Sequence, residues 1–387
     1  MGSLIKFKLN SPYLFIYFLS WHVRHILKIV IDDYLSVQTF YIDFYLMTLG
    51  MIIGGLIVYN YQYKSVKHEK EIKYFDLELI YNTNVLVAPD GQYKKLFLII
   101  FAAVFDFVQF SLDSYFGIMM DKIISPTFDL RLGCLTTIVS SLLCTYTIGF
   151  VTGKHQKMSL IIMSLCLIAE IVLEIALKPA NQIFGYFILA RVLIILEYIF
   201  DSFDDCVEKY LVEVNFLNPF KVVMLKGIIE LILSIFYSIG KDPFGDVIKV
   251  FKQKDAPKII CLFLLFLAYF FLSAMVNVYK IYCNVIYTPM AKSLMDYFMT
   301  PFYNIYYFLK FHDFYDNKIY FIVSEIISLT IDFFGLLYNE FIILFCCGLE
   351  HETKSEIKRR ATIHEILKED EEDEEDEEEN EENNDIN

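Results

Sequence analysis

Apolar residues dominate the chain in runs of about 20, separated by short polar segments. A helix of that length crosses the hydrocarbon core of a bilayer. The first run carries Arg24, His25 and Lys28 in its second half, so it could instead lie along the membrane interface. The pattern predicts an all-α integral membrane protein with about ten transmembrane helices, at 10–30, 38–60, 94–118, 131–152, 158–177, 183–205, 217–239, 258–280, 287–308 and 319–346.

Polar residues inside these runs follow helical stripes. At 100° per residue, Asp106, Gln109 and Asp113 fall within about 60° of one another. Glu325 and Asp332 are seven residues apart and also share a face. A charge in hydrocarbon costs at least about 2.5 kcal/mol on insertion scales, so each stripe should face protein or a water-filled cavity.

Bases within the runs offer partners for these acids. Lys226 and Glu230, and likewise Lys292 and Asp296, stand four residues apart and could pair across one helical turn. Such groups serve either as links between helices or as the lining of a polar translocation cavity. The candidate cavity-lining or substrate-binding residues are Asp106, Gln109, Asp113, Lys226, Glu230, Lys292, Asp296, Glu325 and Asp332.

Segment lengths suggest an internal duplication. Residues 94–177 and 258–346 each read as a long span, a Ser-Pro or Thr-Pro turn, a span, a short loop and another span. Ten spans then divide into two sets of five, and the odd number inverts the second set in the membrane. The predicted organisation is a first half at 1–178, a second half at 179–350 and a tail at 351–387.

The net charge of −15 belongs almost entirely to the tail, because residues 369–387 hold 14 acids and no base. Such a segment has no core to bury and is expected to be disordered. Lysines in 64–95 and 154–157, and the bases after the last span, fall on one side of a ten-span topology, which predicts cytosolic termini. The loop at 241–258 opposes this orientation.

Few motifs point to catalysis. Asp201-Ser-Phe-Asp204-Asp205 resembles the acidic clusters that hold magnesium in membrane lipid transferases, but the second acidic motif expected with it is missing. The cysteines lack ligand spacing and are expected to be small buried hydrophobic residues. We therefore expect no enzymatic activity, no cofactor and no metal, while the transferase stays as an alternative.

The second half, from about Arg191 to Ala361, resembles the drug/metabolite transporter superfamily, in particular the nucleotide-sugar-transporter-like solute carrier family 35. The resemblance lies in three segments: Val207-Glu208-Lys209-Tyr210 through Asn218-Pro219-Phe220-Lys221 to Gly227, Asn277-Val-Tyr-Lys280, and Thr288-Pro289 through Lys292 to Asp296. It implies a ten-helix fold with cytosolic termini in a Golgi or reticulum membrane. Lys226 departs from the family, where an acid commonly precedes the glycine.

These features together predict a transporter that moves a small polar or anionic metabolite by alternating access. Lys226 and Lys292 would neutralise an anionic substrate, while the acids would bind hydroxyl groups or carry a coupling proton. The expected partners are a small-molecule substrate and membrane lipids, with no nucleic acid. A homodimer and a basic protein bound to the tail stay open, as does a membrane scaffold that has lost transport.

Overall fold

In the computed structural model, the described residues are almost entirely helical. They comprise 5–7, 12–31, 40–68, 89–120, 126–149, 152–176, 184–215, 217–240, 244–252, 255–286, 288–293, 318–344 and the single positions Tyr297, Ile305, Thr353, Glu356 and Arg360. The elements are β1 (Ile5–Phe7), α1 (Pro12–Ile29), α2 (Phe40–His68), α4 (Pro89–Met120), α5 (Pro126–Thr147), α6 (Lys154–Ala176), α7 (Phe184–Glu213), α8 (Pro219–Tyr237), α9 (Gly245–Lys252), α10 (Ala256–Ile286), the 3₁₀ helix η3 (Pro289–Ser293), α12 (Lys318–Tyr338) and β2 (Ile342–Leu344).

The all-α class is confirmed, and α-helices occupy nine of the ten predicted ranges in the part of the chain described. The range 287–308 begins as η3, and most of it lies outside the described residues. The short helix α9, with Lys249 and Lys252 in its last turn, was not predicted. It lies in the lysine-rich loop between α8 and α10.

Four helices of the described part are long and apolar enough to cross a membrane, over Tyr41–Tyr61, Lys94–Asp113, Lys154–Leu173 and Ala256–Asn284. On α6 the exposed residues Ile161, Leu165, Ile168 and Val172 form an apolar stripe at helical spacing. Charged residues of other helices are buried instead. Apolar side chains outside and charges inside are compatible with a multi-pass membrane protein.

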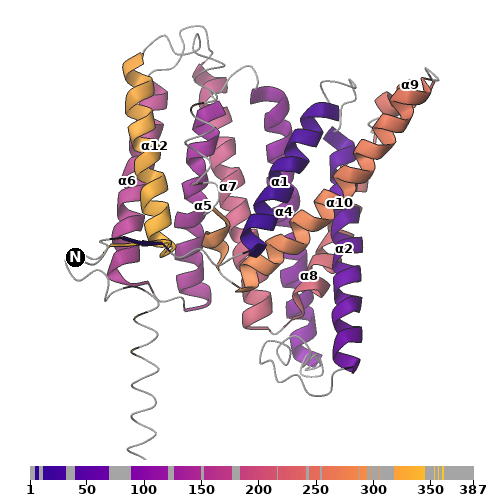
Figure 1. The fold of residues 1–387 in the computed structure, drawn as a ribbon, viewed down its shortest axis with the longest axis horizontal. Coiled ribbons are helices and arrows are strands. Elements are labelled where there is room, and N and C mark those ends of the chain that lie inside the picture. Colours follow the sequence, from indigo (N-terminus) through magenta and orange to yellow (C-terminus); the bar gives the residue numbers. More distant parts are fainter. Residues whose placement is uncertain are drawn as a thin grey trace, which may run out of the picture.

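The helices form two neighbouring groups joined by α7 (Figure 1). In one group α12 packs against α6, and both contact α5. In the other, α2 packs against α8 and α10, while α1 packs against α10. Helix α7 contacts α5 of the first group and α4 of the second. A charged face on α7 can therefore meet residues from both sides.

The last predicted span is wrong in its C-terminal part, because α12 ends at Tyr338 rather than continuing to 346. The Phe341 amide donates to the Leu336 carbonyl at 3.0 Å and the Glu340 amide to the Leu337 carbonyl at 3.1 Å. Glu340 has a φ of 56°, which completes a Schellman helix terminus. The chain then forms β2, which pairs antiparallel with β1, so Ile5 lies opposite Leu344.

Gly50 and Gly54 of α2 allow close helix packing. A Cβ atom on Gly50 would lie 2.9 Å from the backbone nitrogen of Ala274 on α10, and one on Gly54 would lie 3.2 Å from the Ala274 Cβ. On the other side, a Cβ on Gly227 of α8 would lie 2.8 Å from Met51 Cβ of α2. Small residues thus let α2 approach both α8 and α10, as at other membrane helix interfaces.

Gly50→Ala should lower the free energy of unfolding in detergent by about 1–3 kcal/mol, because the added methyl group meets backbone atoms that cannot move aside. Gly133→Ala on α5 is the matched control, since a Cβ there has no neighbour within 4 Å. The control should be neutral or stabilising by up to about 1 kcal/mol, the gain for replacing a helical glycine by alanine. Equal thermal stability of the two variants would contradict this packing.

Candidate functional site: a buried charge cluster around α7

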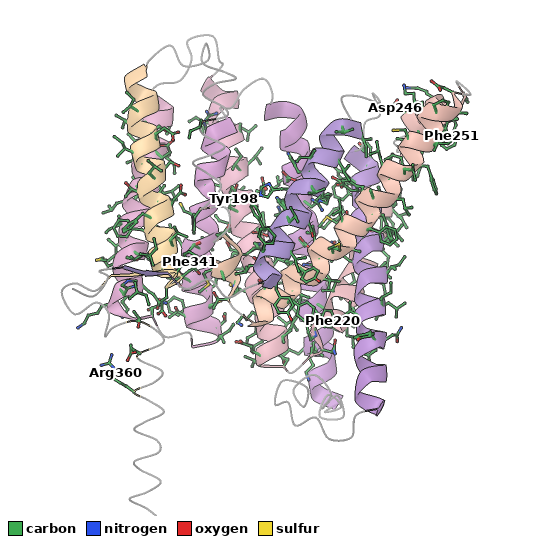
Figure 2. The ribbon with its side chains drawn as sticks, in the orientation of Figure 1. Tyr198, Phe220, Asp246, Phe251, Phe341 and Arg360 are labelled. Atoms are coloured by element: carbon green, nitrogen blue, oxygen red, sulfur yellow. The ribbon has the colours of Figure 1, made fainter. Side chains whose placement is uncertain are left out.

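Four carboxylates lie on one face of α7: Asp201, Asp204, Asp205 and Glu208. Their spacing of i, i+3, i+4 and i+7 places them on the same side over two helical turns. Asp204 and Asp205 are completely buried, and the Asp201 side chain is 16% exposed. The face therefore points into the protein. Figure 2 labels Tyr198, one turn before Asp201, near the middle of the molecule.

Helix α8 brings Lys226 to this face. The Asn218 side chain caps α8 by accepting hydrogen bonds from the backbone amides of Phe220 and Lys221, and Pro219 fills the first helical position. The Lys226 ammonium donates to both oxygens of Asp204 at 2.7 and 2.6 Å and to Glu208 Oε1 at 2.7 Å. It is only 1% exposed.

Helix α4 adds Asp106 from the opposite side of Lys226. Asp106 Oδ2 lies 2.6 Å from Lys226 Nζ, and the Asp106 side chain is 3% exposed. One ammonium group thus bridges carboxylates from α4 and α7. Charge-assisted contacts of this kind are about twice as strong as neutral hydrogen bonds.

Two further lysines complete the arrangement. Lys280 of α10 donates to Asp204 Oδ2 at 2.8 Å and lies 3.3 Å from Asp205 Oδ1. Lys292 of η3 donates to both oxygens of Asp201 at 2.8 and 2.7 Å and also to Asp205. Both lysine side chains are 11% exposed, so this end of the arrangement is more open than the Lys226 end.

We refer to these eight residues as the charge cluster: Asp106, Asp201, Asp204, Asp205, Glu208, Lys226, Lys280 and Lys292. Five elements contribute to it, namely α4, α7, α8, α10 and η3. Five carboxylates face three ammonium groups, so the formal charge is −2 when all eight are ionised. Burying unpaired charge costs several kcal/mol, which favours uptake of a proton or another cation.

The predicted pairing of Lys226 with Glu230 differs from the structure, in which the ion pairs of Lys226 reach other helices. Carboxylates on α4 and α7 bind its ammonium group at 2.6 and 2.7 Å. Glu230 is 3% exposed and contacts Asp106 instead. Lys292 likewise pairs with α7, and Asp296 lies outside the described residues.

The stripe predicted on α4 divides between two sites. Gln109 donates to Glu197 of α7 at 3.4 Å, close to the charge cluster. Asp113 acts electrostatically on Lys28 of α1 instead. Lys28 Nζ lies 2.9 Å from Asp43 Oδ2 of α2, and the Tyr269 hydroxyl of α10 also donates to Asp43. We refer to Lys28, Asp43 and Tyr269 as the α1–α2 ion pair.

The stripe predicted on α12 belongs to a third location. Asp332 is 6% exposed and Glu325 is half-buried. On the same helix, Ser324 donates to Glu170 of α6 at 2.8 Å. The expectation that Asp332 faces protein is therefore confirmed, but its neighbours are α5 and α6, because α12 packs against them.

Sequence reasoning missed the centre of the site. Lys280 and Glu208 appear only within segments that carry the family resemblance, and Asp201, Asp204 and Asp205 only within the transferase motif. The acidic spacing of i, i+3, i+4 and i+7 on α7 was the available signal. No corresponding signal existed for Lys280, whose role depends on the packing of α10 against α7.

The transferase alternative requires Asp201, Asp204 and Asp205 to hold magnesium. Ligand atoms of Asp204, Asp205 and Glu208 do lie within 4.8 Å of one another. However, each of these carboxylates and Asp201 contacts a lysine ammonium or the Asn284 amide. Cationic and donor groups already occupy the positions from which a metal would be bound, so the donor set does not fit magnesium.

The cysteines are thiols where the structure describes them, and four of the six are buried: Cys134, Cys144, Cys206 and Cys283. Cys144 and Cys206 contact each other, with 3.3 Å between their sulfur atoms, where α5 meets α7. Cys261 is exposed and departs from the expected burial. Cys346 and Cys347 lie outside the described residues.

No protein-family model matches this chain, and no match was found among curated proteins. The functional conclusion therefore rests on the charge cluster and on the way the helices pack.

Proposed function

We propose that this protein is a membrane transporter that moves a small polar or anionic metabolite, of the nucleotide-sugar class, by alternating access. The observation that carries the proposal is the charge cluster, which is buried among five elements where the two helix groups meet. Burying eight charged residues inside an apolar bundle costs free energy, and ionisable residues within membrane helices are usually functional. Substrate and ion sites of transporters lie at such internal junctions.

Helix packing supports a ten-span inverted repeat. In that architecture the equivalent elements are α1 and α7, α2 and α8, α4 and α10, α5 and η3, and α6 and α12. If each element is replaced by its equivalent, the observed α1–α10 contact becomes α7–α4, which is also observed. In the same way the α2–α10 contact becomes α8–α4, which is observed as well. The contacts α2–α8, α5–η3 and α6–α12 each join an element to its own equivalent. A fold built from two related halves produces this pattern.

The same replacement of each helix by its equivalent relates the two main charged sites, the α1–α2 ion pair and the charge cluster. The α1–α2 ion pair joins α1, α2 and α10, and the replacement converts these helices into α7, α8 and α4. Those are the helices that hold Asp204, Lys226 and Asp106. Asp113 and Asp106 stand about 10.5 Å apart along α4, since a helix rises 1.5 Å per residue. Charged contacts at two depths would suit a protein that opens alternately to each side.

Lys292 and Lys280 are the groups best placed to meet an anionic substrate, because they are the most exposed lysines of the charge cluster. An approaching phosphate would replace Asp201 as a partner of Lys292. The antiparallel pairing of β1 with β2 holds the N-terminal strand beside the end of α12, which agrees with both termini on one side. We place that side in the cytosol on the basis of the lysine-rich loops. The choice of an endomembrane follows the family resemblance alone.

The proposal is tested by counter-exchange in proteoliposomes. Purified full-length protein is reconstituted into vesicles loaded with unlabelled nucleotide sugars, nucleotides or neutral metabolites, and entry of the radiolabelled compound is followed. Saturable exchange of one compound class is expected. Protein that is monodisperse before and after reconstitution, yet exchanges no member of the panel, would overturn transport.

Removing residues 369–387 distinguishes a transporter from a scaffold. We expect the truncated protein to exchange substrate at the wild-type rate, because the lysines proposed to meet the substrate, Lys280 and Lys292, belong to α10 and η3. The measurement is the initial exchange rate at matched protein density, with untruncated protein as the control. Loss of exchange on truncation would give the tail a direct part in transport.

A further inference from the structure

Two buried carboxyl groups contact each other beside the charge cluster. Glu230 of α8 and Asp106 of α4 lie within hydrogen-bonding contact, although they carry the same charge when ionised. Both residues are 3% exposed. Two adjacent carboxylates cannot both stay ionised in a medium of low dielectric constant unless cations compensate them.

The hydrogen bonds of this pair are incomplete without a proton. Glu230 Oε1 is a buried oxygen that accepts no hydrogen bond. Asp106 Oδ2, by contrast, lies 2.6 Å from Lys226 Nζ and is compensated by that ammonium group. Buried polar atoms are nearly always satisfied, and a carboxylic acid donates one O–H bond whereas a carboxylate donates none. One proton shared by the pair supplies the missing donor.

The surrounding charges do not supply an alternative counter-ion for Glu230. The Lys226 ammonium, one turn away, is already shared among Asp106, Asp204 and Glu208. Lys280 lies 3.9 Å from Asp106 and makes its shortest contact with Asp204. The titratable groups of the elements packed against this part of α8 are Asp106 on α4, Asp204 and Glu208 on α7, Lys280 on α10, and Asp43 and Tyr45 on α2. Glu230 adds one more acid to a cluster that already has an excess of acids.

We propose that Asp106 and Glu230 form a binding site for one proton, and that this proton is the coupling ion of transport. The inference rests on the proposed transport function. Binding of the proton weakens the attraction between Asp106 and the Lys226 ammonium group. It also lowers by one the negative charge of the site, which repels an anionic substrate. When the proton leaves, Lys226 is drawn back to the carboxylates. Entry of an anion should therefore be favoured from the side with the lower pH.

Infrared spectroscopy of the purified protein in detergent tests the proton directly. At neutral pH the wild-type protein should show the absorption of a buried protonated carboxyl group. Glu230→Gln should lack it and remain folded, because glutamine has the shape and neutrality of protonated glutamate. Glu213→Gln is the control, since Glu213 pairs with Lys209 at 2.6 Å and is 38% exposed. An unchanged absorption in Glu230→Gln, or failure of that variant to fold, would overturn the proton site.

Transport provides the second readout. With the panel compound that wild-type protein exchanges, a gradient of two pH units should drive accumulation at least about tenfold above the level without a gradient, since one coupled proton supports up to about tenfold per pH unit. Glu230→Gln should lose accumulation, while Glu213→Gln keeps both exchange and accumulation. Accumulation retained in Glu230→Gln would overturn coupling through this pair. If wild-type protein exchanges no compound, the proposed function fails, and the infrared result still decides whether the proton is bound.

Discussion

Lys226→Met should produce the largest loss of stability of any single substitution in the charge cluster. The lysine contacts Asp106, Asp204 and Glu208 and is 1% exposed, so its removal leaves buried carboxylates without their shared cation. Breaking a buried ion pair by removing one partner costs about 3–5 kcal/mol, and here one group serves three partners. Thermal unfolding of the purified variant in detergent, followed by circular dichroism, measures the effect.

Lys249→Met is the matched control. Lys249 also pairs with an acid, Asp246 at 2.7 Å, but its side chain is 74% exposed. An exposed pair contributes about 0–1 kcal/mol, so the control should unfold near the wild-type temperature. Adding Asp204→Asn to Lys226→Met should recover part of the loss, because it removes one of the uncompensated carboxylates. A Lys226→Met protein as stable as the control would show that these carboxylates are compensated in another way.

Lys292→Ala should abolish substrate exchange and leave the protein folded. Lys292 binds Asp201 and Asp205 at the more exposed end of the cluster, where water can reach the Asp201 carboxylate after the lysine is lost. If Lys292 contacts an anionic substrate, losing about 3 kcal/mol of charge-assisted binding lowers the exchange rate by more than about 100-fold. The initial rate of counter-exchange, at equal amounts of reconstituted protein, measures this loss.

Lys249→Ala serves as the control for this experiment, because it removes one lysine far from the cluster in an exposed helix. It should exchange at the wild-type rate. Full exchange by Lys292→Ala would remove this residue from the substrate site. A folded Lys292→Ala protein with no exchange, next to an active control, would assign the end of the cluster formed by α7 and η3 to substrate binding.

Several candidate residues could be recognised from sequence because a charge within an apolar run is informative by itself. Asp106, Lys226 and Glu230 were recognised in this way, and all three are buried together. Helical angles on α4 predicted correctly that Asp106 and Asp113 share a face, but they did not predict that the two acids interact with different helices. Asp106 and Asp113 share a stripe, yet they stand seven positions apart along α4, so Asp113 acts electrostatically on Lys28 while Asp106 pairs with Lys226.

Pairing partners were the part that sequence could not provide. The rule for residues four apart suggested that Lys226 binds Glu230, but carboxylates of α4 and α7 bind it instead. The partners of Lys280 could not be inferred locally, because they are 75 or more residues away in the chain. For the same reason the stripe on α12 could be assigned to a protein-facing side but not to its neighbours α5 and α6.

The sequence by itself determined the apolar helices and their approximate ends. These follow from helical periodicity and chain length, which act between residues close together in the chain. Tertiary structure alone decided that four acids of α7 meet three lysines from α8, α10 and η3, and that Glu230 contacts Asp106. Electrostatic contacts form between whichever groups packing brings within a few ångströms, and that depends on the rotation and depth of every helix at once.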